Sequence, residues 1–470
     1  MAATTATPSG HIGNLNMRQE QSLRELWNVV MLAWEPDPEI PKADSIDDSF
    51  LETDCFSPTK ARRRLFSFSR PPSEEPPVKK TRYNISDNLC LALKNLGAGT
   101  YEIKAVRTQL FKIRGDKLRT AFLSLLKQDH PDALLLRFLR SEKWDVPKTL
   151  IKLIAALNWR TYEYNVDNEI LLKGEEYRLG KAQQIDSKEQ KHSEEFMHHL
   201  KVNRGSLHGV DRRGRPIFII WAENHNSDMS NQKALRDYCI QCMETVHILM
   251  VEPVETMTVI FDLTLFSLSN WDPNTAKFLI ETCKKNYPES LGAMIFYNAP
   301  WFFSGIGKMI NGLLNPSVTE IHFLSGVKEL ETMIPREHIL RELGGDEDWD
   351  WEYIDPLPHE NDKLHNTAER ITILAERKEL GNELFSLTNE AILGEETYAV
   401  HEQRNKVIRQ LRENYWRLDP YVRSRTILDR TGIIKAGGEI DFYPKSEIHD
   451  DDSKISTEQL CLQEVLRVTV

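Results

Sequence analysis

The sequence predicts an α/β fold, in which a helical subdomain precedes a parallel β-sheet and further helices follow it. Residues 201–345 alternate short apolar β-type runs with helical segments, the order that builds parallel strands joined by right-handed crossovers. Before and after this stretch, apolar residues recur at three- and four-residue spacing, which is typical of amphipathic helices. The 470 residues are enough for two or three folded units with tails.

Residues 1–34 contain one amphipathic helix, because Leu23, Leu26, Trp27 and Val30 fall on one helical face and two prolines end the pattern. Residues 35–84 combine many prolines, serines and charges of both signs, so we predict a disordered linker. Ser67 lies three residues after an arginine run. It is either a target for a basophilic kinase or an ordinary linker residue.

The pattern divides the rest of the chain into four parts. Residues 85–175 are a helical subdomain, and residues 200–350 hold the sheet. We predict strands at 216–221, 256–263, 291–297 and 320–324, with helices near 231–251, 273–286 and 301–312. Residues 360–440 form a C-terminal helical extension, and residues 441–470 are an acidic, Ser-rich tail that we expect to be disordered.

Composition narrows the function class. The net charge of −11 argues against nucleic-acid binding, which needs basic stripes on the folded part. No apolar run approaches the roughly 18 residues of a membrane span, and the first ten residues lack a secretory pattern. We therefore expect a cytoplasmic protein. The single C-x-x-C pair, Cys239 and Cys242, lies in an apolar helical stretch, which predicts buried thiols rather than a metal or redox site.

Enzyme motifs fail when they are tested in turn. Gly305, Gly307 and Lys308 resemble part of a phosphate-binding loop, but Phe302 stands where that loop needs its first glycine and Met309 where it needs Ser or Thr. No nucleophile elbow and no H-E-x-x-H zinc motif occur. The sequence therefore predicts no catalytic residues, no metal and no cofactor, and a protein that is not an enzyme.

A distinctive stretch follows the predicted strand 291–297. A proline ends the strand, three aromatic residues begin the next helix, and Gly305 and Gly307 follow within it. Glycine inside a helix costs about 1 kcal/mol relative to alanine. Such a weakened, very apolar helix is suited to moving against a lipid or a membrane, although an ordinary buried helix also fits the pattern.

Several short motifs, taken in order, resemble the CRAL-TRIO lipid-binding family. The run NYPESLG at 286–292, with YNAP at 297–300 and LNP at 314–316, is similar to the central signature of that family. LRFLR at 136–140 with KWDV at 143–146 resembles its N-terminal helical motif, residues 209–216 its first hairpin and residues 343–345 its closing turn. The flanks at Trp27, 345–349 and 413–421 resemble the fungal branch of non-classical phosphatidylinositol-transfer proteins.

The resemblance implies a helical cap on a parallel sheet, and a pocket for one phospholipid under a gating helix at about 301–314. It also implies a carrier that presents phosphatidylinositol to a lipid kinase or moves it between organelles, with transient membrane contact. The residues expected to contact the lipid are Phe218, Ile220, Met257, Val259, Phe261, Phe296, Tyr297 and His322. Those expected in the gate are Trp301, Phe302, Phe303, Gly305 and Gly307.

Head-group recognition departs from the family pattern. Lys143 and Glu289 match the family's head-group positions, but Glu142, Ser290 and Glu320 stand where the family has basic residues. Phosphatidylinositol is the lipid we expect. The alternatives are a weakly polar lipid such as a sterol precursor, and a lipid-dependent sensor or scaffold that a partner reads through the C-terminal helices.

Overall fold

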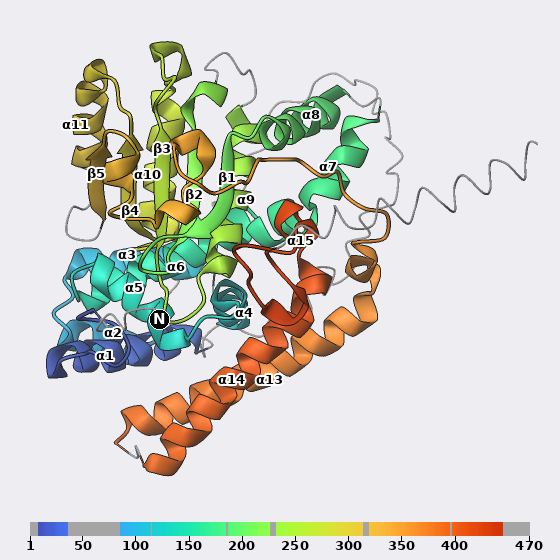
Figure 1. The fold of residues 1–470 in the computed structure, drawn as a ribbon. Coiled ribbons are helices and arrows are strands. Elements are labelled where there is room, and N and C mark those ends of the chain that lie inside the picture. Colours follow the sequence, from blue (N-terminus) through green and yellow to red (C-terminus); the bar gives the residue numbers. More distant parts are fainter. Residues whose placement is uncertain are drawn as a thin grey trace, which may run out of the picture.

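The structure, a computed structural model, describes residues 8–35, 85–113, 115–184, 187–225, 232–313, 319–394 and 397–444. The predicted linker from residue 36 onward, with Ser67, and the predicted tail beyond Pro444 lie outside these residues. Within them the predicted α/β organisation is confirmed. Helices come first, a five-stranded sheet follows, and two long helices lie toward the C-terminal end (Figure 1).

The first part of the chain is helical and has its own core of buried leucines and aromatics. The N-terminal helix α1 belongs to this core, although about fifty residues separate it from the next helix. The indole N–H of Trp27 donates to Asp132 at 2.7 Å, so α1 is tied to the start of α5. The helices are α1 (Met17–Trp34), α2 (Asp87–Asn95), α3 (Thr100–Lys112), α4 (Gly115–Leu126), α5 (Pro131–Ser141), α6 (Val146–Asn158), the π-helical η2 (Trp159–Glu163) and η3 (Val166–Leu172), α7 (Gly174–Ala182) and α8 (Ser187–Lys201).

The sheet has the strand order β1-β2-β3-β4-β5. The four predicted strands are β2 (Pro216–Trp221), β3 (Met257–Asp262), β4 (Leu291–Tyr297) and β5 (Glu320–Leu324), and they pair in parallel. An additional edge strand, β1 (Gly205–Val210), pairs antiparallel with β2. Three helices connect the parallel strands: α9 (Gln232–Leu249), α10 (Pro273–Asn286) and α11 (Ser304–Leu313). Because spatial order follows chain order, right-handed crossovers put these helices on one face.

The two faces of the sheet bury different sets of side chains. The face toward α9, α10 and α11 carries Val259, Met294 and Phe296. The opposite face carries Ile219, Ile260 and Ile295, which pack against residues 327–343. This covering segment contains α12 (Val327–Leu330), η7 (Arg336–His338) and η8 (Arg341–Leu343). Burial on both faces explains why the strands appear in the sequence as continuous apolar runs.

The C-terminal helices α13 (Thr367–Ile392) and α14 (Tyr398–Val422) form a long antiparallel hairpin whose turn projects away from the rest of the molecule (Figure 1). The turn-side half of α13 and the first half of α14 join the helical core through Leu384, Phe385 and Val407, and Leu411 at the middle of α14 belongs to the same core. This packing makes the hairpin part of the folded body rather than a separate unit.

The chain then returns to the sheet through α15 (Ile427–Arg430) and residues 431–444. The hydroxyl of Tyr443 accepts a hydrogen bond from the backbone N–H of Val210 at 3.0 Å, and its ring stacks on His338 at 4.3 Å. Residues 441–444 fall within the predicted tail, and of these Tyr443 packs on the edge strand β1.

Candidate functional site

A cavity of about 210 Å³ lies between the sheet and its three crossover helices. It is larger than the roughly 150 Å³ engineered cavity that stays dry and holds benzene. Six of the predicted lipid contacts line it, and all six lie on the sheet: Phe218, Ile220, Met257, Val259, Phe261 and Phe296. The cavity wall is predominantly apolar, as in pockets that bury the greater part of a hydrophobic ligand.

Strand register explains why these residues meet. Ile220, Phe261 and Phe296 are direct partners across β2, β3 and β4, and Phe323 of β5 continues the row. The rings of Phe261 and Phe296 stack at 5.3 Å, and those of Phe296 and Phe323 at 5.0 Å. Because side chains alternate along a strand, one face receives every second residue. The result is a continuous aromatic surface beneath the helices.

The opposite wall comes from α9 and α10, and it is rich in sulfur. Three of its cysteines, Cys239, Cys242 and Cys283, line the cavity. Burial raises the pKa of Cys242 and Cys283 to about 12, and it also raises the pKa of Cys239. These thiols are therefore protonated at neutral pH and serve as apolar wall. Among the described residues, no group of three or more His, Cys, Asp or Glu is placed to hold a metal ion.

The cavity has a polar end near the carboxyl ends of the parallel strands. Arg204, which precedes β1, and His225, which follows β2, lie there together with Gln232, Asn270 and Asp272. Asp272 caps α10: its carboxylate accepts from the N–H of Asn274 at 2.9 Å and the hydroxyl of Thr275 at 2.6 Å. The Nε of Arg204 is buried without a hydrogen-bond partner.

The predicted gate closes this same end. Phe303, in η6 (Trp301–Phe303), and Ile310 of α11 line the cavity. Trp301, by contrast, is 89% exposed. The Phe302 and Phe303 rings lie 6.1 Å and 5.5 Å from that of Phe266 in the loop after β3. The gate thus presents one aromatic residue to the solvent and one to the cavity.

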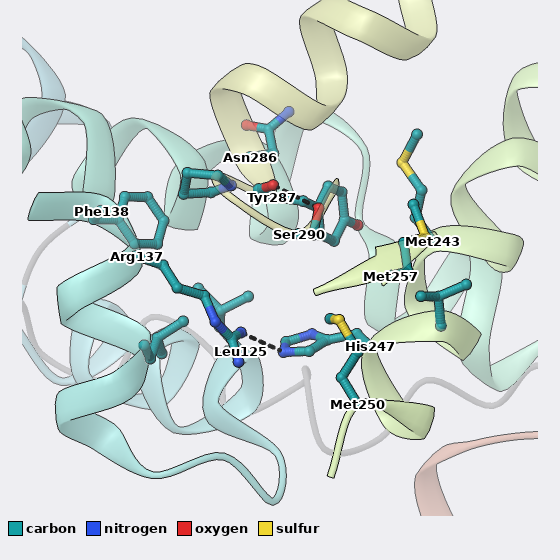
Figure 2. A pocket seen from close by; sticks show the side chains of 13 residues that line it. Leu125, Arg137, Phe138, Met243, His247, Met250, Met257, Asn286, Tyr287 and Ser290 are labelled. Carbon is teal, nitrogen blue, oxygen red and sulfur yellow. Dashed lines mark hydrogen bonds between the residues drawn. The ribbon is translucent and has the colours of Figure 1, made fainter. Parts of the chain in front are cut away.

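A smaller cavity of about 30 Å³ lies between the helical subdomain and the amino ends of the strands (Figure 2). Its volume is on the scale of one water molecule. Arg137 and His247 approach each other across it at 3.4 Å. Met243, Val246 and Met257 line both cavities, so these three side chains separate the polar junction from the main apolar space.

Comparison with known proteins places this architecture in a family. Residues 200–345 match the CRAL/TRIO domain, and residues 102–155 match the CRAL/TRIO N-terminal domain. The chain is 33% identical over 319 residues to CRAL-TRIO domain-containing protein C3H8.02 of Schizosaccharomyces pombe, covering 67% of this chain and 69% of that protein. The chain belongs to the CRAL-TRIO family.

Two further relatives of this CRAL-TRIO protein carry transfer-protein names. Phosphatidylinositol transfer protein CSR1 of Eremothecium gossypii is 28% identical over 449 residues, covering 92% of this chain and 99% of that protein. Phosphatidylinositol/phosphatidylcholine transfer protein SFH7 of Arabidopsis thaliana is 27% identical over 221 residues, covering 43% of this chain and 36% of that protein. The first match includes the C-terminal hairpin as well as the sheet. No helix in the described part of the chain is long and apolar enough to cross a membrane.

Two predicted lipid contacts of the CRAL-TRIO domain lie on the wrong face of the sheet. Tyr297 packs against the covering segment, and its hydroxyl donates to the carbonyl of Leu343 at 2.7 Å. His322 is the register partner of Ile295, on that same face, and its Nε2 lies 3.5 Å from Glu320. Tyr297 follows Phe296, which lines the cavity, and His322 precedes Phe323, which is on the same face as Phe296. The alternation of the strands therefore turns Tyr297 and His322 to the other face. Neither belongs to the cavity wall.

The predicted head-group pair lies at the other end of the strands. Glu289 precedes β4 and accepts a hydrogen bond from Arg140, which also donates to Glu255 at 2.8 Å and to the carbonyl of Gly10 at 2.9 Å. Burial raises the pKa of Glu289, and Arg140 opposes that rise. Lys143 is exposed on the turn after α5, and no contact joins it to Glu289. A role for either residue in binding a head group stays a prediction.

Sequence reasoning missed the helical half of the cavity and its polar end. Leu235, Cys239, Cys242 and Val246 recur at three- and four-residue spacing along α9, and this stripe was available as a signal for a second wall. Arg204 and His225 had no such signal, because they lie in loops that the fold alone brings together.

Proposed function

We propose that this CRAL-TRIO protein is a carrier, not a catalyst, which holds one lipid in the apolar cavity between the sheet and its crossover helices and exchanges it at membranes. We further propose that the lipid is phosphatidylinositol. Family membership supports a lipid-binding or lipid-transfer role. The name of the Eremothecium gossypii relative, which this chain matches over nearly its full length, supports the choice of lipid.

The observation that carries the proposal is the apolar wall of the cavity. Burying one methylene contributes about 0.8 kcal/mol, so two acyl chains of roughly thirty methylenes face a cost of about 20 kcal/mol or more in leaving a bilayer for water. A cavity bounded by the aromatic row of the sheet and the sulfur-rich face of α9 replaces that water with apolar side chains. Exchange is then limited by opening the gate.

The gate end of the molecule carries the apolar residues that a membrane would cover. Trp301 is 89% exposed, and Leu265 and Leu268 in the neighbouring loop are 68% and 66% exposed. These two leucines flank Phe266, whose ring contacts both phenylalanines of the gate. A bilayer would bury these exposed side chains. It would also give Phe303, which lines the cavity, an apolar partner once the gate has moved.

Transfer of fluorescent phosphatidylinositol between donor and acceptor liposomes tests the proposal. Trp301→Glu should slow transfer about tenfold or more, because burial of one large apolar side chain contributes about 1.5–3 kcal/mol. Binding of the lipid should persist, since Trp301 does not line the cavity. Leu393→Glu is the matched control, because Leu393 is 70% exposed at the far end of α13. Equal transfer by both variants would refute the membrane-facing gate, and a wild-type protein that binds no lipid would refute the carrier.

A further inference from the structure

Arg204 is a buried cation on the wall of an apolar cavity. The residue is 3% exposed, and it lies at the junction of α8 and β1, beside the carboxyl end of β2. A buried charge is strongly unfavourable unless an opposite charge or several hydrogen bonds compensate it. Apart from Arg204, Asp272 is the one charged side chain that the structure describes on this wall, and the other lining side chains are apolar or neutral. Arg204 therefore needs a partner that balances its charge.

No carboxylate in the described part of the chain forms an ion pair with Arg204. Burial lowers its pKa, and the only groups that oppose this effect are Tyr238 and Cys239. Asp272, which lines the same cavity, is occupied at the N-terminus of α10 by Asn274 and Thr275 and by the amide of Gln232 at 3.3 Å. The positive charge of the guanidinium is therefore not neutralised by any carboxylate among the described residues.

His225 holds the guanidinium without neutralising it. Its Nδ1 lies 3.5 Å from the Nη1 of Arg204, and its Nε2 lies 3.0 Å from the Arg204 carbonyl oxygen. Nε2 must donate to that carbonyl, so Nδ1 is left to accept. Burial lowers the pKa of His225 to about 4, and Arg204 contributes to that decrease. The ring is therefore neutral near pH 7 and acts as a polar support for the cation.

The two ends of the strands differ in how their arginines are used. At the amino end, Arg140 is engaged by Glu255, Glu289 and the carbonyl of Gly10, so the charge of this arginine is compensated within the protein. At the carboxyl end, where ligands enter open α/β sheets, Arg204 lacks such partners. Phe303 of the predicted gate, which follows β4, lines the cavity at that same end.

We propose that Arg204 binds the anionic group of the lipid held in the cavity, either a phosphodiester or a carboxylate, while the apolar wall takes the hydrocarbon. This inference rests on the proposed carrier function and specifies its ligand class as an anionic amphiphile. The guanidinium offers a fork of N–H donors that matches such oxygens. The buried, unpartnered carbonyl oxygen of Gln232 lies in the same lining and can accept from a hydroxyl beside the anion.

Three probes with one fluorescent acyl label test the inference on the full-length, delipidated protein: phosphatidylinositol, hexadecanoic acid and diacylglycerol. Arg204→Gln should weaken binding of the anionic probe about tenfold or more, the effect of losing one charge-assisted hydrogen bond. Binding of diacylglycerol should not change. If Arg204→Gln weakens binding of phosphatidylinositol, the anionic group is a phosphodiester; if it weakens binding of hexadecanoic acid, the group is a carboxylate. Arg204→Lys should retain most of the affinity, and Arg213→Gln, at a half-exposed arginine paired with Glu320, should behave as wild type.

Thermal unfolding of the delipidated protein separates a ligand site from a structural one. Removing an uncompensated buried charge should leave the Tm of Arg204→Gln equal to or above that of wild type. A clear fall in Tm, or equal loss of all three probes, would overturn the inference. Binding of diacylglycerol alone by wild type would also overturn it and leave the carrier proposal standing. If wild type bound none of the probes, the carrier proposal would fall as well.

Discussion

Gly307 of α11 lies directly against the ring of Phe323 on β5. A Cβ atom added to Gly307 would come within 2.9 Å of the ring Cζ and 3.2 Å of Cε1. Gly305, two residues earlier, faces open space, with no atom within 4 Å of an added Cβ. The two glycines of the gate thus have different roles: one permits close packing of the helix on the sheet, and the other only lowers helix propensity.

Gly307→Ala should therefore loosen the gate, whereas Gly305→Ala should not. Both changes favour the helix by about 1 kcal/mol, but only the first forces the gate or the Phe323 ring to move. Labelling of Cys239, Cys242 and Cys283 by a neutral thiol reagent reports gate opening, because these thiols line the cavity. With the other cysteines replaced by serine, Gly307→Ala should label faster than wild type and Gly305→Ala at the wild-type rate or slower. Equal rates for all three proteins would contradict this role.

The sequence pattern locates most of the strands, but it does not show which face of the sheet a residue takes or which residues surround it. Apolar runs identify β2, β3 and β4, because strands buried on both faces carry bulky residues at nearly every position. The edge strand β5, with the sequence EIHFL, is only partly buried. The same property hides which face a residue takes: Phe296 lines the cavity, whereas its neighbour Tyr297 packs on the opposite face of the sheet. Strand β1 contains Gly205, His208 and Gly209, and this polar, glycine-rich composition gives no strand pattern. Only the resemblance of residues 209–216 to the family's first hairpin points to a strand there. Arg204 meets His225 and the cavity only through the packing of distant segments, and no short sequence pattern predicts such packing.

Arg377 joins the C-terminal hairpin to the helical subdomain. Its buried guanidinium donates to the carbonyls of Lys127 at 2.7 Å, Leu411 at 2.9 Å and Leu123 at 3.0 Å. Arg377→Met should lower the free energy of unfolding by about 2–4 kcal/mol, because several buried carbonyl oxygens lose their donor. Chemical denaturation followed by tryptophan fluorescence measures the loss.

Arg417→Met is the matched control for Arg377→Met. Its guanidinium is 57% exposed on α14 and pairs with Glu376 at 2.9 Å, so the expected change is within about 0.5 kcal/mol. If both variants lost the same stability, the carbonyl-binding role of Arg377 would be wrong. If neither lost any, the hairpin would not depend on this contact.

The carboxylate of Asp129 should make the protein sensitive to acid. It accepts from Arg137 at 2.9 Å and lies 2.8 Å from the Nε2 of His247. Burial acts to raise its pKa, but Arg137 and His247 outweigh burial and lower the pKa from 3.8 to about 2. Because the folded-state pKa lies below the ordinary value, the ionised group stabilises the fold above about pH 4, and this contribution disappears as the pH falls toward 2.

Comparison of Asp129→Asn with wild type tests this linkage. The wild-type advantage in free energy of unfolding should contain a pH-dependent part of about 2 kcal/mol at pH 6, and that part should shrink between pH 4 and pH 2. Urea denaturation at a series of pH values measures it. Asp116→Asn, at a carboxylate that is 77% exposed, should show no such trend. The difference in free energy of unfolding between Asp129→Asn and wild type could instead stay constant from pH 6 to pH 2. Asp129 would then act through packing alone, and its ion pair with Arg137 would not stabilise the junction between the helical subdomain and the sheet.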